Sequence, residues 1–149
     1  MYSPNFVDFE TYARSGNLIP VYREILADIE TPVSVLRKMQ TKDYVYLLES
    51  VEGGEKWGRY SFIGTDAGVV FKVRGADTVV EEQGATTTRK HEGRPLDVLR
   101  DLLKRYRPVA TPGLPRFFGG AVGYVGYDVV RYFENLPAAP PDDLNLEES

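Results

Sequence analysis

The sequence predicts an α+β fold in which mostly antiparallel strands are combined with two or three helices. Three observations lead to this prediction. Apolar residues recur at helical spacing in three stretches, and short runs rich in β-branched and aromatic residues lie between the last two of them. Turn-like residues such as glycine and aspartate separate those runs at close intervals. Strands do not alternate regularly with helices, so we do not expect a parallel sheet built from βαβ units.

The first expected helix contains apolar residues at helical spacing, namely Phe6, Phe9, Tyr12 and Ala13. Ser3 before Pro4 is a suitable start, because proline fits the first position of a helix. Gly16 stands where this helix would end.

The second expected helix starts at Thr31 and Pro32, since a threonine cap followed by a proline is a common helix start. Its apolar side continues to residue 39 or 40. The third expected helix, residues 95–107, has a single apolar stripe, acidic residues early and basic residues late, which suits the helix dipole. Pro108 then stops it.

Strand character is strongest between the second and third helices. The run 43–50 shows little alternation of polar and apolar residues, so we expect it to be buried on both faces. The following runs should form short antiparallel strands joined by turns: 59–64, 69–74, 78–82 and 86–90. Residues 18–29 and 117–133 also have strand character, although Pro20 would restrict the first to a sheet edge or a strand beginning.

The composition excludes several classes of protein. A net charge of −4 argues against a nucleic-acid binder, which usually carries a basic stripe. The sequence has no cysteine, and therefore no disulfide, thiolate nucleophile or zinc–cysteine cluster. No apolar run approaches the ~20 residues of a membrane span, and the first residues do not resemble a signal peptide, so we expect the cytoplasm. The single histidine, His91, lies in a polar run and is expected to be a solvated loop residue.

The common catalytic patterns are not found. The glycine-rich run 118–127 matches neither the phosphate-loop nor the dinucleotide-binding pattern, and we interpret it as close backbone packing or bulges within strands. Neighbouring residues of a strand point to opposite faces, so the acidic pairs are expected to be solvated surface: Glu81-Glu82, Asp142-Asp143 and Glu147-Glu148. We therefore expect no catalytic and no metal-binding residue in this chain.

The run Leu47-Leu48-Glu49-Ser50 is more informative, because it places a carboxylate and a hydroxyl at the end of a strand that is expected to be buried. A buried carboxylate needs a cation or several hydrogen-bond donors. Arg59, which opens the next expected strand, is a candidate partner for Glu49. Physical arguments alone favour a structural ion pair over a ligand site and leave both open.

Three runs in this order resemble the N-terminal region of anthranilate synthase component I, a member of the chorismate-utilising enzyme family: 47–50, Gly58-Arg59-Tyr60-Ser61-Phe62-Ile63-Gly64, and Phe118-Gly119-Gly120-Ala121-Val122-Gly123-Tyr124 with Tyr127-Asp128. Residues 19–24 and 31–34 look similar as well. The resemblance runs from about Phe6 to Leu144. It implies that residues 1–149 are the regulatory N-terminal region of a larger chorismate-binding enzyme fold, with residues 137–149 as a connector to a catalytic portion.

The resemblance also implies the chemistry. The enzyme of this family is a lyase that converts chorismate to anthranilate, the first committed step of tryptophan biosynthesis, with Mg²⁺ and with ammonia from a glutamine amidotransferase subunit. Its catalytic and Mg²⁺-binding residues lie in the C-terminal portion, so this chain should be inactive alone. Its N-terminal portion contributes to an allosteric site for L-tryptophan, the feedback inhibitor. That site maps onto Ser50, with Leu48, Glu49 and Arg59 as further lining residues.

Two other interpretations remain. The matching region of aminodeoxychorismate synthase component I shares the fold and feeds folate synthesis, and the glutamate of the Leu-Leu-Glu-Ser run favours the anthranilate branch over it. A free-standing amino-acid-binding module is the alternative from a different class. The proline-rich and acidic ending at 137–149 argues against such a module, because it resembles a connector.

Overall fold

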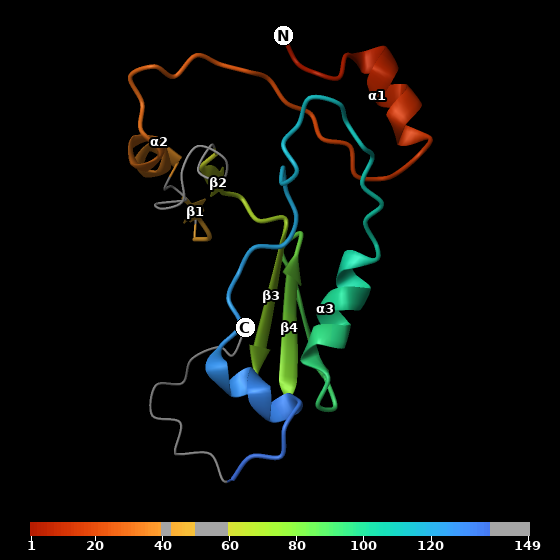
Figure 1. The fold of residues 1–149 in the computed structure, drawn as a ribbon. Helices are drawn as coiled ribbons and strands as arrows, with labels where there is room; N and C mark the ends of the chain where they lie inside the picture. The colour runs from red at the N-terminus through yellow and green to blue at the C-terminus, as the bar shows by residue number, and fades with distance from the viewer. Residues whose placement is uncertain (40–42, 50–59, 138–149) are drawn as a thin grey trace. The chain divides into compact units, whose positions relative to one another are not determined.

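The computed structural model describes residues 1–39, 43–49 and 60–137, and the chain divides into two compact units. One unit combines residues 1–24 with the part of the chain that follows residue 70, and the other comprises residues 25–70. Each unit contains one small antiparallel sheet and at least one helix (Figure 1). The α+β prediction is confirmed.

The sheet of the larger unit has the strand order β3-β4-β5, formed by Val69–Arg74, Asp77–Glu82 and Ala85–Lys90. β4 and β5 pair antiparallel, with Glu82 opposite Ala85 and Asp77 opposite Lys90. Gln83 and Gly84 connect them with φ values of 52° and 78°. Positive φ at both central residues is the backbone of a type I′ turn, whose twist matches that of the paired strands. The expected hairpin is therefore confirmed.

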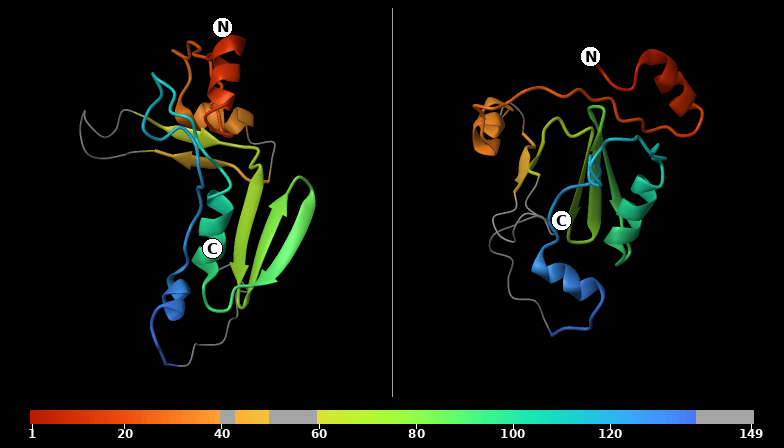
Figure 2. Two further views of the ribbon diagram at one scale, coloured as in Figure 1. Left: turned by 90° about the vertical axis from the view of Figure 1, so that its right-hand side faces the viewer. Right: turned by 45° about the horizontal axis from the view of Figure 1, so that its top comes forward.

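Helix α3 (Pro95–Leu103) runs beside this sheet in the three views of Figures 1 and 2. It ends about one turn earlier than predicted because Asn17 binds the backbone that follows it. The Asn17 side-chain amide donates to the Arg105 carbonyl at 2.8 Å, and its carbonyl accepts from the Arg107 N–H at 2.6 Å. These bonds fix the chain outside helical geometry before Pro108 is reached.

Helix α1 (Phe6–Ala13) lies in the predicted stretch but starts later than a cap at Ser3 would place it. The side chain of Asn5 caps it by accepting from the Asp8 N–H at 3.0 Å. Ser3, the predicted cap, forms instead two backbone hydrogen bonds of 2.8 Å with Tyr22. Apart from that bridge and one between Leu18 and Pro108, residues 18–29 are not in a strand, which corrects the expectation for this run.

The described core of the larger unit is small. Its buried apolar side chains are Val73, Pro95, Val109 and Val129, and the buried polar ones are Thr78 and His91. His91 is only 6% exposed, so the prediction of a solvated residue was wrong. Its Nδ1 accepts from the Gly93 N–H at 3.1 Å, and Nε2 lies 2.6 Å from the Gly75 carbonyl. Both ring nitrogens have backbone partners, which allows the imidazole to be buried within a polar stretch of sequence.

The smaller unit contains helix α2 (Pro32–Met39) and a hairpin of two short antiparallel strands, β1 (Tyr46–Leu48) and β2 (Phe62–Gly64). Thr31 caps α2 as predicted: its hydroxyl accepts from the Ser34 N–H at 3.1 Å. β1 is shorter than the predicted strand and is not buried on both faces, because Tyr46 and Leu47 are half-buried and Leu48 is exposed. Among the residues described, only β2 pairs with it, so its apolar run is partly uncovered there.

The glycine-rich run did not form the predicted strand. Residues 117–126 have no regular secondary structure, and the 3-10 helix η2 (Tyr127–Tyr132) follows them. A β-carbon added at Gly119 or Gly123 would meet no atom within 4 Å, so close backbone packing does not explain these glycines here. Strand propensity needs a neighbouring strand, and none lies beside this run among the residues described.

Candidate functional site

The candidate site lies at the end of β1 in the smaller unit. Of the four residues predicted for it, Leu48 and Glu49 are described and Ser50 and Arg59 lie outside the described residues. Leu48 closes β1 and is 43% exposed. Glu49 follows directly and is also exposed. An exposed carboxylate avoids the desolvation cost that the sequence argument assumed for this position.

Strand pairing brings the start of β2 to this point. Leu48 is opposite Phe62, so the residues just outside the ladder, Glu49 and Ser61, are neighbours. The Ser61 hydroxyl lies 3.5 Å from a Glu49 carboxylate oxygen, a long contact that leaves the carboxylate largely accessible. Tyr60 is exposed, and its ring lies 6.1 Å from that of Phe62.

The described part of the site combines three kinds of group. Glu49 offers an accessible negative charge, Ser61 a hydroxyl, and Leu48 and Tyr60 apolar surface. A carboxylate can bind an ammonium group, and aromatic or aliphatic surface can bind the apolar part of an amino acid. Ser61 and Tyr60 were not predicted as site residues, although both stand in the 58–64 run that carried the resemblance. Pairing the run 47–50 antiparallel with the run 58–64 would have placed Ser61 and Tyr60 beside Glu49 and so added them to the predicted site.

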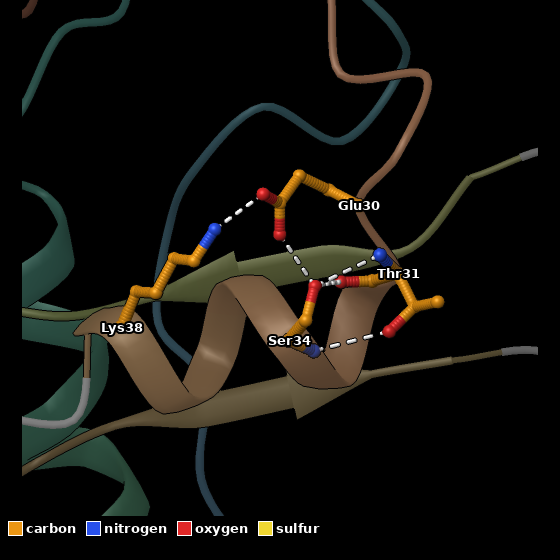
Figure 3. A network of polar contacts seen from close by, with 4 residues as sticks. All are labelled: Glu30, Thr31, Ser34 and Lys38. Carbon is orange, nitrogen blue, oxygen red and sulfur yellow. Dashed lines mark hydrogen bonds and ion pairs between the residues drawn. The ribbon is translucent and has the colours of Figure 1, made fainter.

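A polar network at the start of α2 forms a second feature of the smaller unit (Figure 3). Glu30 accepts hydrogen bonds from the Lys38 ammonium and, at 2.6 Å, from the Ser34 hydroxyl, which lies 2.9 Å from the Thr31 N–H. The hydrogen bond from Lys38, followed by that from Ser34, lowers the pKa of Glu30. These contacts stabilise the start of α2. Because the charges of Glu30 and Lys38 neutralise each other, the network is a weak candidate for ligand binding.

The remaining acidic side chains of interest form ion pairs. Glu81 binds Lys72 at 2.7 Å, and Glu82 forms a two-pronged contact with Arg105 at 3.0 Å. Both are half-buried, which corrects the expectation that this pair is plain solvated surface. Across the described residues, no three His, Asp or Glu side chains are grouped in a way that could hold a metal ion. None of the described helices has the length and apolar character that crossing a membrane requires.

Comparison with known proteins identifies relatives. No family model matches the chain. Three similar sequences are each named anthranilate synthase component 1. That of Acetivibrio thermocellus is 41% identical over 148 residues, that of Synechocystis 45% over 156 residues, and that of Pseudomonas aeruginosa 44% over 139 residues. They cover 99%, 99% and 93% of the chain, which spans only 30%, 30% and 28% of their own lengths.

By their names, these relatives are components of an enzyme that makes anthranilate, so the chain is part of an enzyme component. It is a homologue of the N-terminal region of anthranilate synthase component 1.

Proposed function

We propose that the chain is the tryptophan-sensing region of an anthranilate synthase component 1, and that the end of β1 forms part of its allosteric site. The observation that carries the proposal is alignment of nearly the whole chain with this one enzyme component at 41–45% identity. The accessible carboxylate of Glu49 beside apolar side chains supports the location of the site.

Each proposed group matches one part of the inhibitor. Ser50 and Arg59 bind the carboxylate of L-tryptophan, the first through its hydroxyl and backbone N–H and the second through its guanidinium. Glu49 binds the ammonium group, and Leu48 contacts the indole ring. The rest of the complete polypeptide supplies the other wall of the pocket. Glu49 can be tested separately, because the neutral Glu49→Gln removes the charge and keeps the shape.

The reaction itself is assigned to the rest of the polypeptide. There, chorismate is converted to anthranilate with Mg²⁺, and a glutamine amidotransferase subunit, component II, delivers the ammonia in the cytoplasm. The described residues provide no cluster that fits Mg²⁺, so we assign no step of the reaction to them. This division leaves the chain as a regulatory region without catalytic residues.

The proposal predicts that Ser50→Phe in the complete enzyme weakens tryptophan inhibition and leaves uninhibited turnover nearly intact. The bulky ring would fill the space of the inhibitor at a distance from the chemistry. Allosteric coupling is typically worth ~1–3 kcal/mol, so the half-inhibiting concentration should rise by about 5–150-fold. Inhibition curves followed by anthranilate fluorescence measure the effect.

Ser15→Phe is the matched control, because it places the same ring at an exposed serine in the turn after α1. It should leave the inhibition curve unchanged. An unchanged curve for Ser50→Phe would remove Ser50 from the site. If Ser50→Phe instead lowered turnover in parallel, the substitution would have damaged the fold.

A further inference from the structure

His91 is the one buried titratable side chain among the residues described, and its polar groups all have partners. Its backbone N–H donates to the Ala76 carbonyl at 3.2 Å, and its carbonyl accepts from the Arg94 N–H at 2.8 Å. On the ring, Nδ1 binds the Gly93 N–H and Nε2 faces the Gly75 carbonyl. The residue therefore joins the turn between β3 and β4 to the entrance of α3.

These contacts fit one protonation state of the ring. A carbonyl oxygen can only accept, so Nε2 carries the hydrogen and donates to Gly75. A backbone N–H can only donate, so Nδ1 carries no hydrogen and accepts from Gly93. We assign the neutral Nε2–H tautomer from these partners. A protonated ring has two donors and no acceptor, and it would leave the Gly93 N–H without this partner.

The entrance of α3 depends on this bond because its N-cap residue, Arg94, forms no side-chain cap hydrogen bond. The turn before it has φ values of 52° at Glu92 and 80° at Gly93. Positive φ is uncommon for a residue other than glycine, so Glu92 needs neighbouring contacts to hold it. A positive charge on His91, just before the N-terminus of α3, would also oppose the helix dipole.

Helix η2 covers the ring and provides no negative charge for it. The ring of Tyr132 meets that of His91 edge-on, with centroids 4.9 Å apart, and its hydroxyl donates to the Gly75 carbonyl at 2.8 Å. Within the described part of the chain, no carboxylate is hydrogen-bonded to the imidazole. A protonated ring would therefore be buried here without an anionic partner, which is unfavourable.

The charges around the ring stay constant in the pH range in which histidines titrate. Histidine ordinarily changes its charge between about pH 5 and 8, whereas carboxylates titrate below about pH 5, and tyrosine, lysine and arginine near pH 10 or above. The charged residues that flank the contacts of His91 are three ion pairs and three further side chains: Asp77–Lys90, Asp97–Arg100 and Asp128–Arg131, with Arg74, Glu92 and Arg94. A change between pH 8 and pH 5.5 is therefore assigned to the imidazole.

We propose that His91 is a pH-sensitive latch that holds the entrance of α3 to the turn between β3 and β4. The neutral ring keeps the latch closed, and proton uptake at Nδ1 opens it, because the Gly93 N–H loses its acceptor. The contribution of the latch to stability is present at higher pH and is lost as the pH falls. This inference goes beyond the proposed function and does not depend on it, since every contact lies within the larger unit.

Hydrogen exchange of the complete polypeptide, followed by mass spectrometry, tests the latch. After correction for the intrinsic pH dependence of exchange, the peptide that covers residues 92–103 should exchange faster at pH 5.5 than at pH 8. The loss of one hydrogen bond predicts an increase on the order of 2–10-fold. A peptide from α1 is the internal control and should show no such change. An unchanged rate for 92–103, or an equal increase in both peptides, would overturn the proposal.

His91→Asn separates the ring proton from the rest of the fold. An asparagine side chain can accept from the N–H two residues further on, as in an Asx turn, and it does not titrate. The peptide 92–103 of this variant should therefore exchange at the same corrected rate at both pH values. A dependence equal to that of the wild type would assign the effect to another group and overturn the proposal.

The tautomer provides a measurement on the wild type alone. Nitrogen-15 NMR of the complete polypeptide should show the ring of His91, identified by its proximity to the Tyr132 ring, as the neutral Nε2–H tautomer at pH 8. An Nδ1–H tautomer at that pH would contradict the proposal, because Nδ1 could not then accept from Gly93.

Discussion

At the scale of single residues, Gly64 shows how a local steric requirement sets strand pairing. It is opposite Tyr46 across the β1–β2 pair, and a β-carbon at this position would lie 2.0 Å from the Tyr46 ring. Its φ is not in the left-handed region, so another residue could adopt this backbone conformation. Glycine is required here because there is no room for a side chain. The tyrosine ring fills the place of the missing side chain.

We therefore expect Gly64→Ala to destabilise the protein by ~1–3 kcal/mol, the usual cost of adding a methyl group to a filled site. Urea unfolding of the complete polypeptide, followed by tryptophan fluorescence, measures this difference. Gly68→Ala is the matched control in the same unit, because no atom lies within 4 Å of its added β-carbon. Equal destabilisation by both variants would mean that Tyr46 moves aside at little cost.

Residue-level prediction from the sequence failed where the partner was distant in the chain. His91 was expected in solvent because its sequence neighbours are polar, but its ring partners are Gly75 and Tyr132. Glu49 was expected to be buried because the run before it is apolar. In both cases the burial of the side chain depends on tertiary contacts, and the local composition of the sequence does not specify these contacts.

At the scale of elements, the start of α2 is stabilised by charge as well as by its cap. Lys38 and Ser34 lower the pKa of Glu30 below its ordinary value of 4.5. A carboxylate whose pKa is lower in the folded than in the unfolded state stabilises the fold above its unfolded pKa. That contribution is lost as the pH falls through the unfolded pKa toward the folded one.

Glu30→Gln should therefore make stability depend less on pH in the acid range. The wild type should lose stability between about pH 5 and pH 3, and the variant should lose less over the same interval. Melting temperatures across a pH series in the complete polypeptide give the comparison. Glu24→Gln is the control, since the described residues show no ion pair with Glu24, and its pH dependence should match the wild type. If Glu30→Gln gave the wild-type curve, the Lys38 contact would not persist in solution.

Elements with strong local signals were predictable from the sequence. The periodic helices α1, α2 and α3 and the β4–β5 hairpin were all expected within a few residues, because caps, prolines and turn residues act over short distances. Residues 18–29 and 117–133 were mispredicted as strands, since β propensity does not specify a pairing partner. The early end of α3 depends on Asn17, about 90 residues away in the sequence.

At the scale of the whole molecule, few apolar side chains are fully buried among the residues described. They are Val73, Val109, Val129 and Pro95. Together with the 30% span of the relatives, this agrees with a region that is completed by the rest of its polypeptide.

The chain alone should therefore make no anthranilate from chorismate, Mg²⁺ and ammonia. The fluorescence of anthranilate is compared with an enzyme-free blank, and the complete polypeptide under identical conditions is the positive control. Chromatography of the control product also separates anthranilate from aminodeoxychorismate and so distinguishes the two branches. A rate clearly above the blank for purified chain would place catalytic residues within residues 1–149.

The outer edge of β5 has a consequence for the behaviour of the chain in concentrated solution. In the described part of the chain, β5 is the last strand of its sheet, and every one of its residues is exposed. The His91 N–H bonds to the Ala76 carbonyl, so by alternation the backbone groups of Thr86, Thr88 and Lys90 point away from β4. Such an edge is a template for fibril-like stacking, in which identical strands align in register. Arg89 and Lys90 would then meet their own copies, and this repulsion acts as a gatekeeper against aggregation.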